Sequence, residues 1–129
     1  MAGLEGVIVV DLTQYAAGPA ASRLLGELGA TVIKVEDTGL GDFMRHDYPT
    51  KGGGISYYIT ALGRNKKSVS LNLKNEEVVD WFLKMAQEAD IIVESFRPGV
   101  TAKLGIDYES IKKLNPGIIY CSISGYGAN

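Results

Sequence analysis

The first third of the chain places two β-branched runs on either side of a segment with helical spacing. Residues 7–10 show no polar alternation, which is typical of a strand buried on both faces, and Val32, Ile33 and Val35 predict a second strand. Between them apolar residues recur at helical spacing, at Ala21, Leu24, Leu25 and Leu28. A strand, a helix and a strand within about thirty residues predict a right-handed βαβ unit. Ligands of such units dock at the carboxyl end of the first strand, here in the turn after Leu12.

The second half of the chain repeats this alternation. Asn75 followed by two glutamates predicts a helix start, and residues 91–93 form another buried strand. Asp107 begins a further helix that Pro116 ends, and the apolar residues after it predict a last strand. Period-two alternation over residues 69–73 predicts a strand near the edge of the sheet. The whole pattern favours an α/β fold with a Rossmann-like parallel sheet flanked by helices.

The connection from residue 38 to residue 63 is irregular and rich in glycine. Long connections of this kind are often functional. It holds the only histidine, His46, which we interpret as a surface residue because no nucleophile stands near it in the sequence. Residues 56–62 predict a short helix that covers one face of the sheet.

Composition narrows the classes of protein that fit. With 129 residues, 46% of them hydrophobic and 22% charged, the chain has the size and balance of one globular domain. A net charge of -2 argues against a nucleic-acid-binding face. No charged leader opens the chain and no apolar stretch approaches about twenty residues, so we expect a soluble, cytoplasmic protein without a membrane span. The single cysteine, Cys121, fits a reducing compartment, and we expect it to be buried in the last strand.

Three features suggest anion or nucleotide binding, each with a structural alternative. Glu36 lies eighteen residues after Gly18, where Rossmann proteins carry a ribose-binding acid, but the glycines of the dinucleotide fingerprint are missing after Gly18. The basic turn at residues 64–68 is either a solvated turn or a phosphate clamp. Arg97 follows a strand and is either an anion ligand or a surface partner of Glu94. We assign no metal ligand.

Several segments together resemble the N-terminal region of family III CoA-transferases. This family includes formyl-CoA transferase, the carnitine and bile-acid CoA-transferases and alpha-methylacyl-CoA racemase. The similarity covers nearly all of the chain. The segments that carry it are Gly18–Ala20, Leu28–Glu36, Gly41–Asp42, Asn65–Val69, Ala89–Gly99, Leu114–Pro116 and Ser122–Gly127.

The resemblance implies a site for acyl-CoA in a large Rossmann-like domain. Residues 1–129 would be the N-terminal part of that domain, without the family's small domain and C-terminal return to the sheet, and two chains would interlock as a homodimer. Carried over by motif, Ala16 and Ala17 would border the thioester, and the nucleotide end would be bound by Leu71, Asn72, Leu73, Lys74, Ser95, Phe96, Arg97 and Lys103. Formyl-CoA transferase differs in having Gln in place of Ala16 and a basic residue in place of Asp37.

The resemblance also implies a reaction between an acyl-CoA and a carboxylic acid. The family uses an Asp nucleophile and passes through an aspartyl-CoA thioester. The resemblance places this Asp beyond Asn129, so we assign none of the present aspartates a catalytic role and expect these 129 residues alone to be inactive and to self-associate. The alternatives are a racemase-like enzyme and a non-enzymatic CoA or nucleotide binder.

Overall fold

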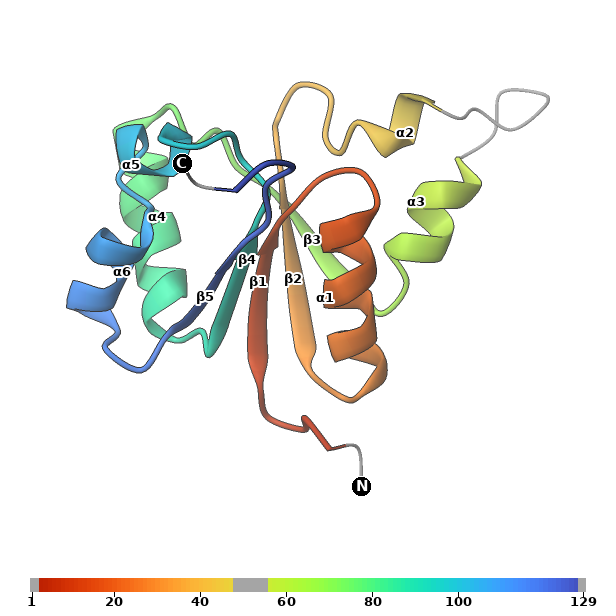
Figure 1. The fold of residues 1–129 in the computed structure, drawn as a ribbon, viewed down its shortest axis with the longest axis horizontal. Coiled ribbons are helices and arrows are strands. Elements are labelled where there is room, and N and C mark those ends of the chain that lie inside the picture. Colours follow the sequence, from red (N-terminus) through yellow and green to blue (C-terminus); the bar gives the residue numbers. More distant parts are fainter. Residues whose placement is uncertain (1–2, 48–55, 128–129) are drawn as a thin grey trace.

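A five-stranded parallel sheet forms the centre of the molecule (Figure 1). The computed structural model describes residues 3–47 and 56–127. In chain order the strands are β1 (Ile8–Leu12), β2 (Thr31–Glu36), β3 (Lys66–Ser70), β4 (Ile91–Glu94) and β5 (Ile119–Ser122). They lie in the sheet in the order β3-β2-β1-β4-β5. The predicted α/β fold is confirmed, and the chain reverses its direction across the sheet between β1 and β4, where such folds bind ligands.

Helices cover the two faces of the sheet unequally. Helix α1 (Ala17–Glu27) and α3 (Tyr57–Leu62) lie on one side, and α4 (Glu76–Gln87) and α6 (Tyr108–Leu114) lie on the other (Figure 1). Two short helices, α2 (Met44–Asp47) and α5 (Val100–Lys103), lie near the carboxyl ends of the strands (Figure 1). The side of the sheet that carries α1 is called the α1 side below.

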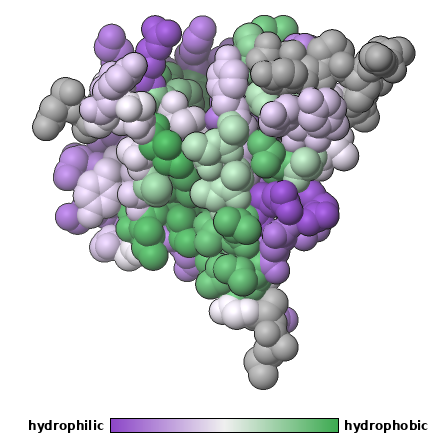
Figure 2. Space-filling view, turned by 45° about the vertical axis from the view of Figure 1, so that its right-hand side comes forward, coloured by the Kyte–Doolittle hydropathy of each residue, from purple (hydrophilic) through white to green (hydrophobic). Residues whose placement is uncertain are grey.

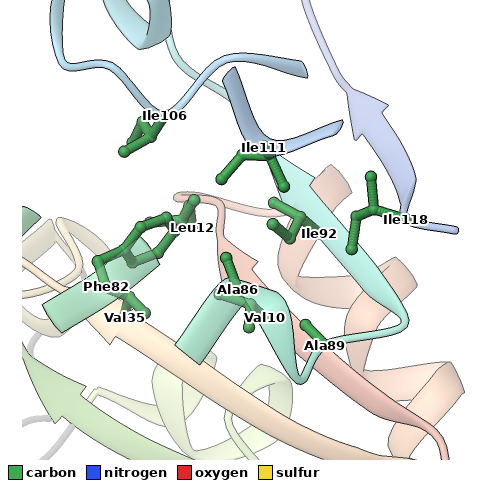
Figure 3. Close-up of a cluster of buried hydrophobic side chains, with 10 residues drawn as sticks. All are labelled: Val10, Leu12, Val35, Phe82, Ala86, Ala89, Ile92, Ile106, Ile111 and Ile118. Atoms are coloured by element: carbon green, nitrogen blue, oxygen red, sulfur yellow. The ribbon is translucent and has the colours of Figure 1, made fainter. Parts of the chain in front are cut away.

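The main core lies between the sheet and the helices α4 and α6. Asn75 caps α4 as predicted, because its Oδ1 accepts from the backbone N–H of Glu77 at 2.9 Å. Asp107 caps α6 in the same way. Strand and helix positions then meet in one cluster (Figure 3), formed by Val10, Leu12, Val35, Phe82, Ala86, Ala89, Ile92, Ile106, Ile111 and Ile118. A smaller cluster under α1 contains Val9, Ala30, Val32 and Val93.

One prediction was wrong and another was right about the strand but not about its extent, both at the edges of the sheet. Cys121 is exposed rather than buried, because β5 is an edge strand and no described helix covers its α1 side. The strand predicted near the edge from the alternation at residues 69–73 is present as β3, but β3 runs from Lys66 to Ser70. Leu71 keeps one further ladder hydrogen bond to the Glu36 carbonyl at 2.9 Å, and the chain then turns away from the sheet.

Candidate ligand-binding cleft

A cleft of about 200 Å³ opens at the carboxyl ends of the strands, beside the point where the strand order reverses. Its walls are mostly apolar, and Lys74 is the one basic residue that lines it within the described part of the chain. The lining residues come from the ends of β1 and β2, the turn after β3, the turn after β4 and helix α5: Leu12, Gln14, Val35, Glu36, Asp37, Leu71, Asn72, Leu73, Lys74, Phe96, Val100 and Leu104. An apolar slot with a few polar groups is the usual form of a small-molecule site.

Two further hollows adjoin this cleft. One of about 550 Å³ shares Leu73, Lys74 and Leu104 with it and adds Lys103 beside the acidic residues Glu76 and Asp80. The other, of about 240 Å³, shares Leu12, Gln14 and Phe96 with the cleft and adds Tyr15, Ser95 and Arg97. The three hollows follow one another along the tips of the strands, with a cationic side chain lining each of them.

The structure brings together all but two of the residues carried over from the family resemblance. Leu71, Asn72, Leu73, Lys74 and Phe96 line the central cleft. Ser95 and Arg97 line the 240 Å³ hollow, and Lys103 lines the 550 Å³ hollow. Ala16 and Ala17 line none of the three. They lie exposed in the turn before α1 and at its first residue.

Sequence reasoning missed part of the lining. Leu12, Val100 and Leu104 line the cleft, but nothing in the sequence pattern distinguishes an apolar residue that faces a cleft from one in the core. Gln14 could have been found, since it directly follows the end of a parallel strand, where ligands dock.

Hydrogen bonds hold the strand tips in place beside the cleft. The backbone N–H of Gln14 donates to Ser95 Oγ at 3.0 Å, which joins the tip of β1 to that of β4. The backbone N–H of Phe96 donates to Glu94 Oε2 at 2.7 Å. Glu94 is buried, and its carboxylate accepts a hydrogen bond within the turn that follows β4. Among the described residues, Arg97 makes no ion pair with Glu94. Arg97 is exposed at the rim of the 240 Å³ hollow.

Glu36 lines the cleft, but its carboxylate is already bonded. Arg45 donates to both oxygens at 2.7 Å, Ser68 Oγ donates at 2.7 Å, and the N–H of Asp42 donates at 2.9 Å. Burial opposes ionisation, yet these donors lower the pKa of Glu36 to about 2. The ribose-binding role of an acid at the end of β2 is therefore not open to Glu36.

The basic turn does not contribute to the cleft, so the phosphate-clamp interpretation was wrong. Residues 64 and 65 precede β3 and residues 66–68 are its first three positions, at the opposite end of the strand from the cleft. Lys66 Nζ lies 2.9 Å from Asp11 Oδ2 under α1, and Arg64 pairs with Glu27 at 2.6 Å. Burial favours the protonated form of Asp11, but Lys34, Lys66 and two hydroxyl donors together hold its pKa below the usual range.

Residues 3–47 and 56–127 show neither a metal site nor a membrane-spanning helix. His46 is exposed, as predicted, with Nε2 2.8 Å from the Leu40 carbonyl oxygen. No group of three or more His, Cys, Asp or Glu residues could hold a metal ion in this part of the chain. No helix within the same ranges has the length and apolar character needed to cross a membrane.

Comparisons with known proteins agree on one family. The family model of CoA-transferase family III matches residues 4–129. The succinyl-CoA:glutarate CoA-transferase of Homo sapiens is 46% identical over 124 residues, which are 96% of this chain and 28% of that protein. The acetyl-CoA:oxalate CoA-transferase of Acetobacter aceti is 44% identical over 123 residues, 95% of this chain and 31% of that protein. The chain thus spans less than a third of these relatives.

Solved structures give the same result. A CAIB/BAIF family protein from Brucella suis superposes with a TM-score of 0.88 at 38% identity, over 97% of this chain and 34% of that one. A crystal structure from M. tuberculosis superposes with a TM-score of 0.91 at 39% identity, over 98% of this chain and 35% of that one.

Proposed function

Because this chain belongs to CoA-transferase family III, we propose that its 129 residues are the acyl-CoA-binding part of an acyl-CoA:carboxylate CoA-transferase. In this proposal they form the N-terminal part of the large Rossmann-like domain. The observation that carries the proposal is the meeting of Leu12, Leu71 and Phe96, which are far apart in the sequence, in one cleft at the strand tips.

The cleft and its neighbours suit the chemistry of CoA. The apolar walls from Leu12, Leu71 and Phe96 suit the pantetheine chain and the face of an adenine ring. Lys74 and Lys103 are exposed at one end, and Arg97 is exposed at the other. In the proposal these cations bind phosphate oxygens through charge-assisted hydrogen bonds.

The thioester end would point toward the turn before α1. Ala16 and Ala17 are small and exposed there, so an acyl group could approach the backbone without displacing a side chain.

We further propose that the complete enzyme transfers CoA through an Asp outside these residues. Its carboxylate oxygen would attack the thioester carbonyl and expel CoA thiolate, giving a mixed anhydride. The thiolate would then attack the aspartyl carbonyl, release the first carboxylate and leave an aspartyl-CoA thioester, which the second carboxylate consumes by the reverse steps. Asp11 and Asp42 are buried in ion pairs and Asp107 caps a helix, so none of these is free to react.

Titration calorimetry with CoA tests the binding proposal. We expect one CoA per chain, and we expect Lys74→Glu to raise the Kd by about tenfold, or about 1.4 kcal/mol, because it reverses a charge beside the phosphates. Lys67→Glu is the matched control, since Lys67 is exposed on β3 and lines none of the three hollows. It should leave the Kd within about twofold.

Failure of the wild-type chain to bind CoA, or equal losses in both variants, would refute the proposal. NAD should bind more weakly than CoA because Glu36 is occupied by Arg45 and Ser68. The 129 residues alone should show no turnover. A racemase-like enzyme or a non-enzymatic binder would use the same cleft, and assays of the full-length protein distinguish them by epimerisation or by the absence of any reaction.

A further inference from the structure

Two lysines are buried on the α1 side of the sheet, and their partners differ. Lys34 in β2 and Lys66 in β3 have side chains that are 3% and 2% exposed. A buried ammonium group is costly unless it is paired and fully hydrogen-bonded. The contacts that each lysine makes therefore indicate which part of the molecule it holds in place.

Lys34 contacts the turn that follows β1. Its Nζ lies 2.7 Å from Asp42 Oδ2 and donates to the carbonyl oxygen of Thr13 at 2.8 Å. Asp42 is itself fixed, because its Oδ1 accepts from the N–H of Met44 and its own N–H donates to Glu36, both at 2.9 Å. The ammonium group of Lys34 is thus held by Asp42 and donates to the Thr13 carbonyl in the turn after β1.

The peptide unit between Thr13 and Gln14 is bonded at both of its ends. A trans peptide is planar, so its C=O and N–H point in opposite directions. The C=O of this unit accepts from Lys34, while its N–H donates to Ser95 Oγ at 3.0 Å. Any rotation of the plane would break both hydrogen bonds.

One residue beyond Gln14, the backbone has an unusual conformation. Tyr15 has a φ of 65°, in the left-handed region that bulky residues rarely adopt. Its ring, half exposed, stacks on Phe43 with the ring centres 5.3 Å apart, and it lines the 240 Å³ hollow. A strained conformation persists where the surrounding structure fixes it, and the doubly bonded peptide is such a constraint.

We propose that Lys34 is a positioning residue for the cleft. It acts through the Thr13 carbonyl to orient the backbone N–H of Gln14 toward Ser95, and it thereby fixes the turn after β1 that lines the 240 Å³ hollow. Lys34 thereby connects the segment around Asp42 to the tips of β1 and β4. The identity of the ligand rests on the proposed function, whereas the orientation of the turn does not.

Lys66 provides a matched comparison within the same buried layer. It too is paired with an aspartate, at 2.9 Å from Asp11, but its other bonds go to the Pro19 carbonyl and to Ser22 Oγ, at 2.9 and 2.8 Å. These groups belong to α1 and not to the turn. Within the described residues, Lys66 reaches the turn only through Asp11, whose Oδ1 accepts from the backbone N–H of Thr13 at 2.9 Å, and its loss leaves the Thr13 carbonyl bonded to Lys34.

The experiment compares Lys34→Met with Lys66→Met in the 129-residue chain. Hydrogen exchange of the backbone N–H of Gln14 (the Gln14 amide below) is followed by NMR, and the Kd for CoA is measured by calorimetry. Both measurements are made at a temperature where circular dichroism shows that both variants are folded. We expect Lys34→Met to reduce the protection of the Gln14 amide at least tenfold and to raise the Kd about tenfold. Lys66→Met should change either value by no more than about twofold. If Lys34→Met does not fold, Lys34→Met/Asp42→Asn takes its place, because it leaves no buried charge unpaired.

A double-mutant cycle adds a readout that general destabilisation would not produce. Lys34→Met and Ser95→Ala each free one end of the same peptide, so their effects on the Kd should be strongly less than additive. Additive effects, an unchanged Gln14 amide in Lys34→Met, or equal changes in Lys66→Met would overturn the proposal. If the wild-type chain does not bind CoA, the proposed function fails, and the exchange of the Gln14 amide alone decides the role of Lys34.

Discussion

At the scale of single residues, Glu36 is the carboxylate with the most extensive bonding beside the cleft. Its pKa falls from 4.5 to about 2 in the folded chain, because the donors Arg45 and Ser68 outweigh the effect of burial. A lowered pKa stabilises the fold at any pH above the unfolded value, and this stabilisation is lost as the pH falls toward the folded value.

We therefore expect the free energy of unfolding to fall between about pH 5 and pH 2 in part through Glu36. Arg45 is 40% exposed, so solvent screens the pair and the contribution is on the order of 2 kcal/mol. Urea unfolding at several pH values should show the largest difference between wild type and Glu36→Gln at pH 7 and a smaller one at pH 3. A difference that does not change with pH would contradict this account.

At the scale of elements, α1 owes its place on the sheet to a glycine. A Cβ at Gly18 would lie 2.3 Å from Cβ of the buried Thr13, so only a residue without a side chain lets the helix approach the tip of β1 this closely. The same helix contains Gly26, where a Cβ would meet Val32 Cγ2 at 3.3 Å, a contact that a small side-chain movement relieves.

Gly18→Ala should therefore destabilise the chain by about 1–3 kcal/mol through overpacking. Gly26→Ala is the control within α1, and it should stay within about 1 kcal/mol of wild type, because the gain in helix propensity offsets the tighter contact. Thermal unfolding of the two variants measures the contrast. Equal stabilities would mean that α1 can shift away from Thr13 at little cost.

Local patterns predicted the elements well, and long-range contacts explain where prediction failed. The sequence predicted β1, α4 and α6 because their signals are local. These signals are the apolar run at residues 7–10 and the helix caps at Asn75 and Asp107. Cys121 was misjudged because the burial of an edge strand depends on what covers it. The pairing of Lys34 with Asp42 had no local signal, since one residue belongs to a strand and the other to an irregular connection.

At the scale of the whole molecule, apolar side chains gather on the α1 side. Figure 2 views this side and shows hydrophobic residues in one broad area above the N-terminus. Leu24 and Leu28 of α1 are 58% and 55% exposed. Ile119 of β5 is 62% exposed and alternates with Tyr120, which packs on the opposite face.

Apolar areas of this kind favour association, so we expect the 129-residue chain to self-associate as its concentration rises. Ile119→Lys should shift the population toward monomer in sedimentation experiments. Leu114→Lys is the control, because Leu114 is exposed on α6 at the other side of the sheet. A monomer at all concentrations, or an equal effect of both variants, would contradict this expectation.

The parallel arrangement of the strands also determines when the sheet can form. The central strand β1 pairs with β2 and with β4, where Val9 lies opposite Val32 and Ile91. Parallel neighbours cannot be joined by a tight hairpin, so every ladder closes a long stretch of backbone and folding is intrinsically slow. During translation, one edge of β1 remains unpaired until residues 91–94 have left the ribosome, and an unpaired strand edge can pair with other chains for that time.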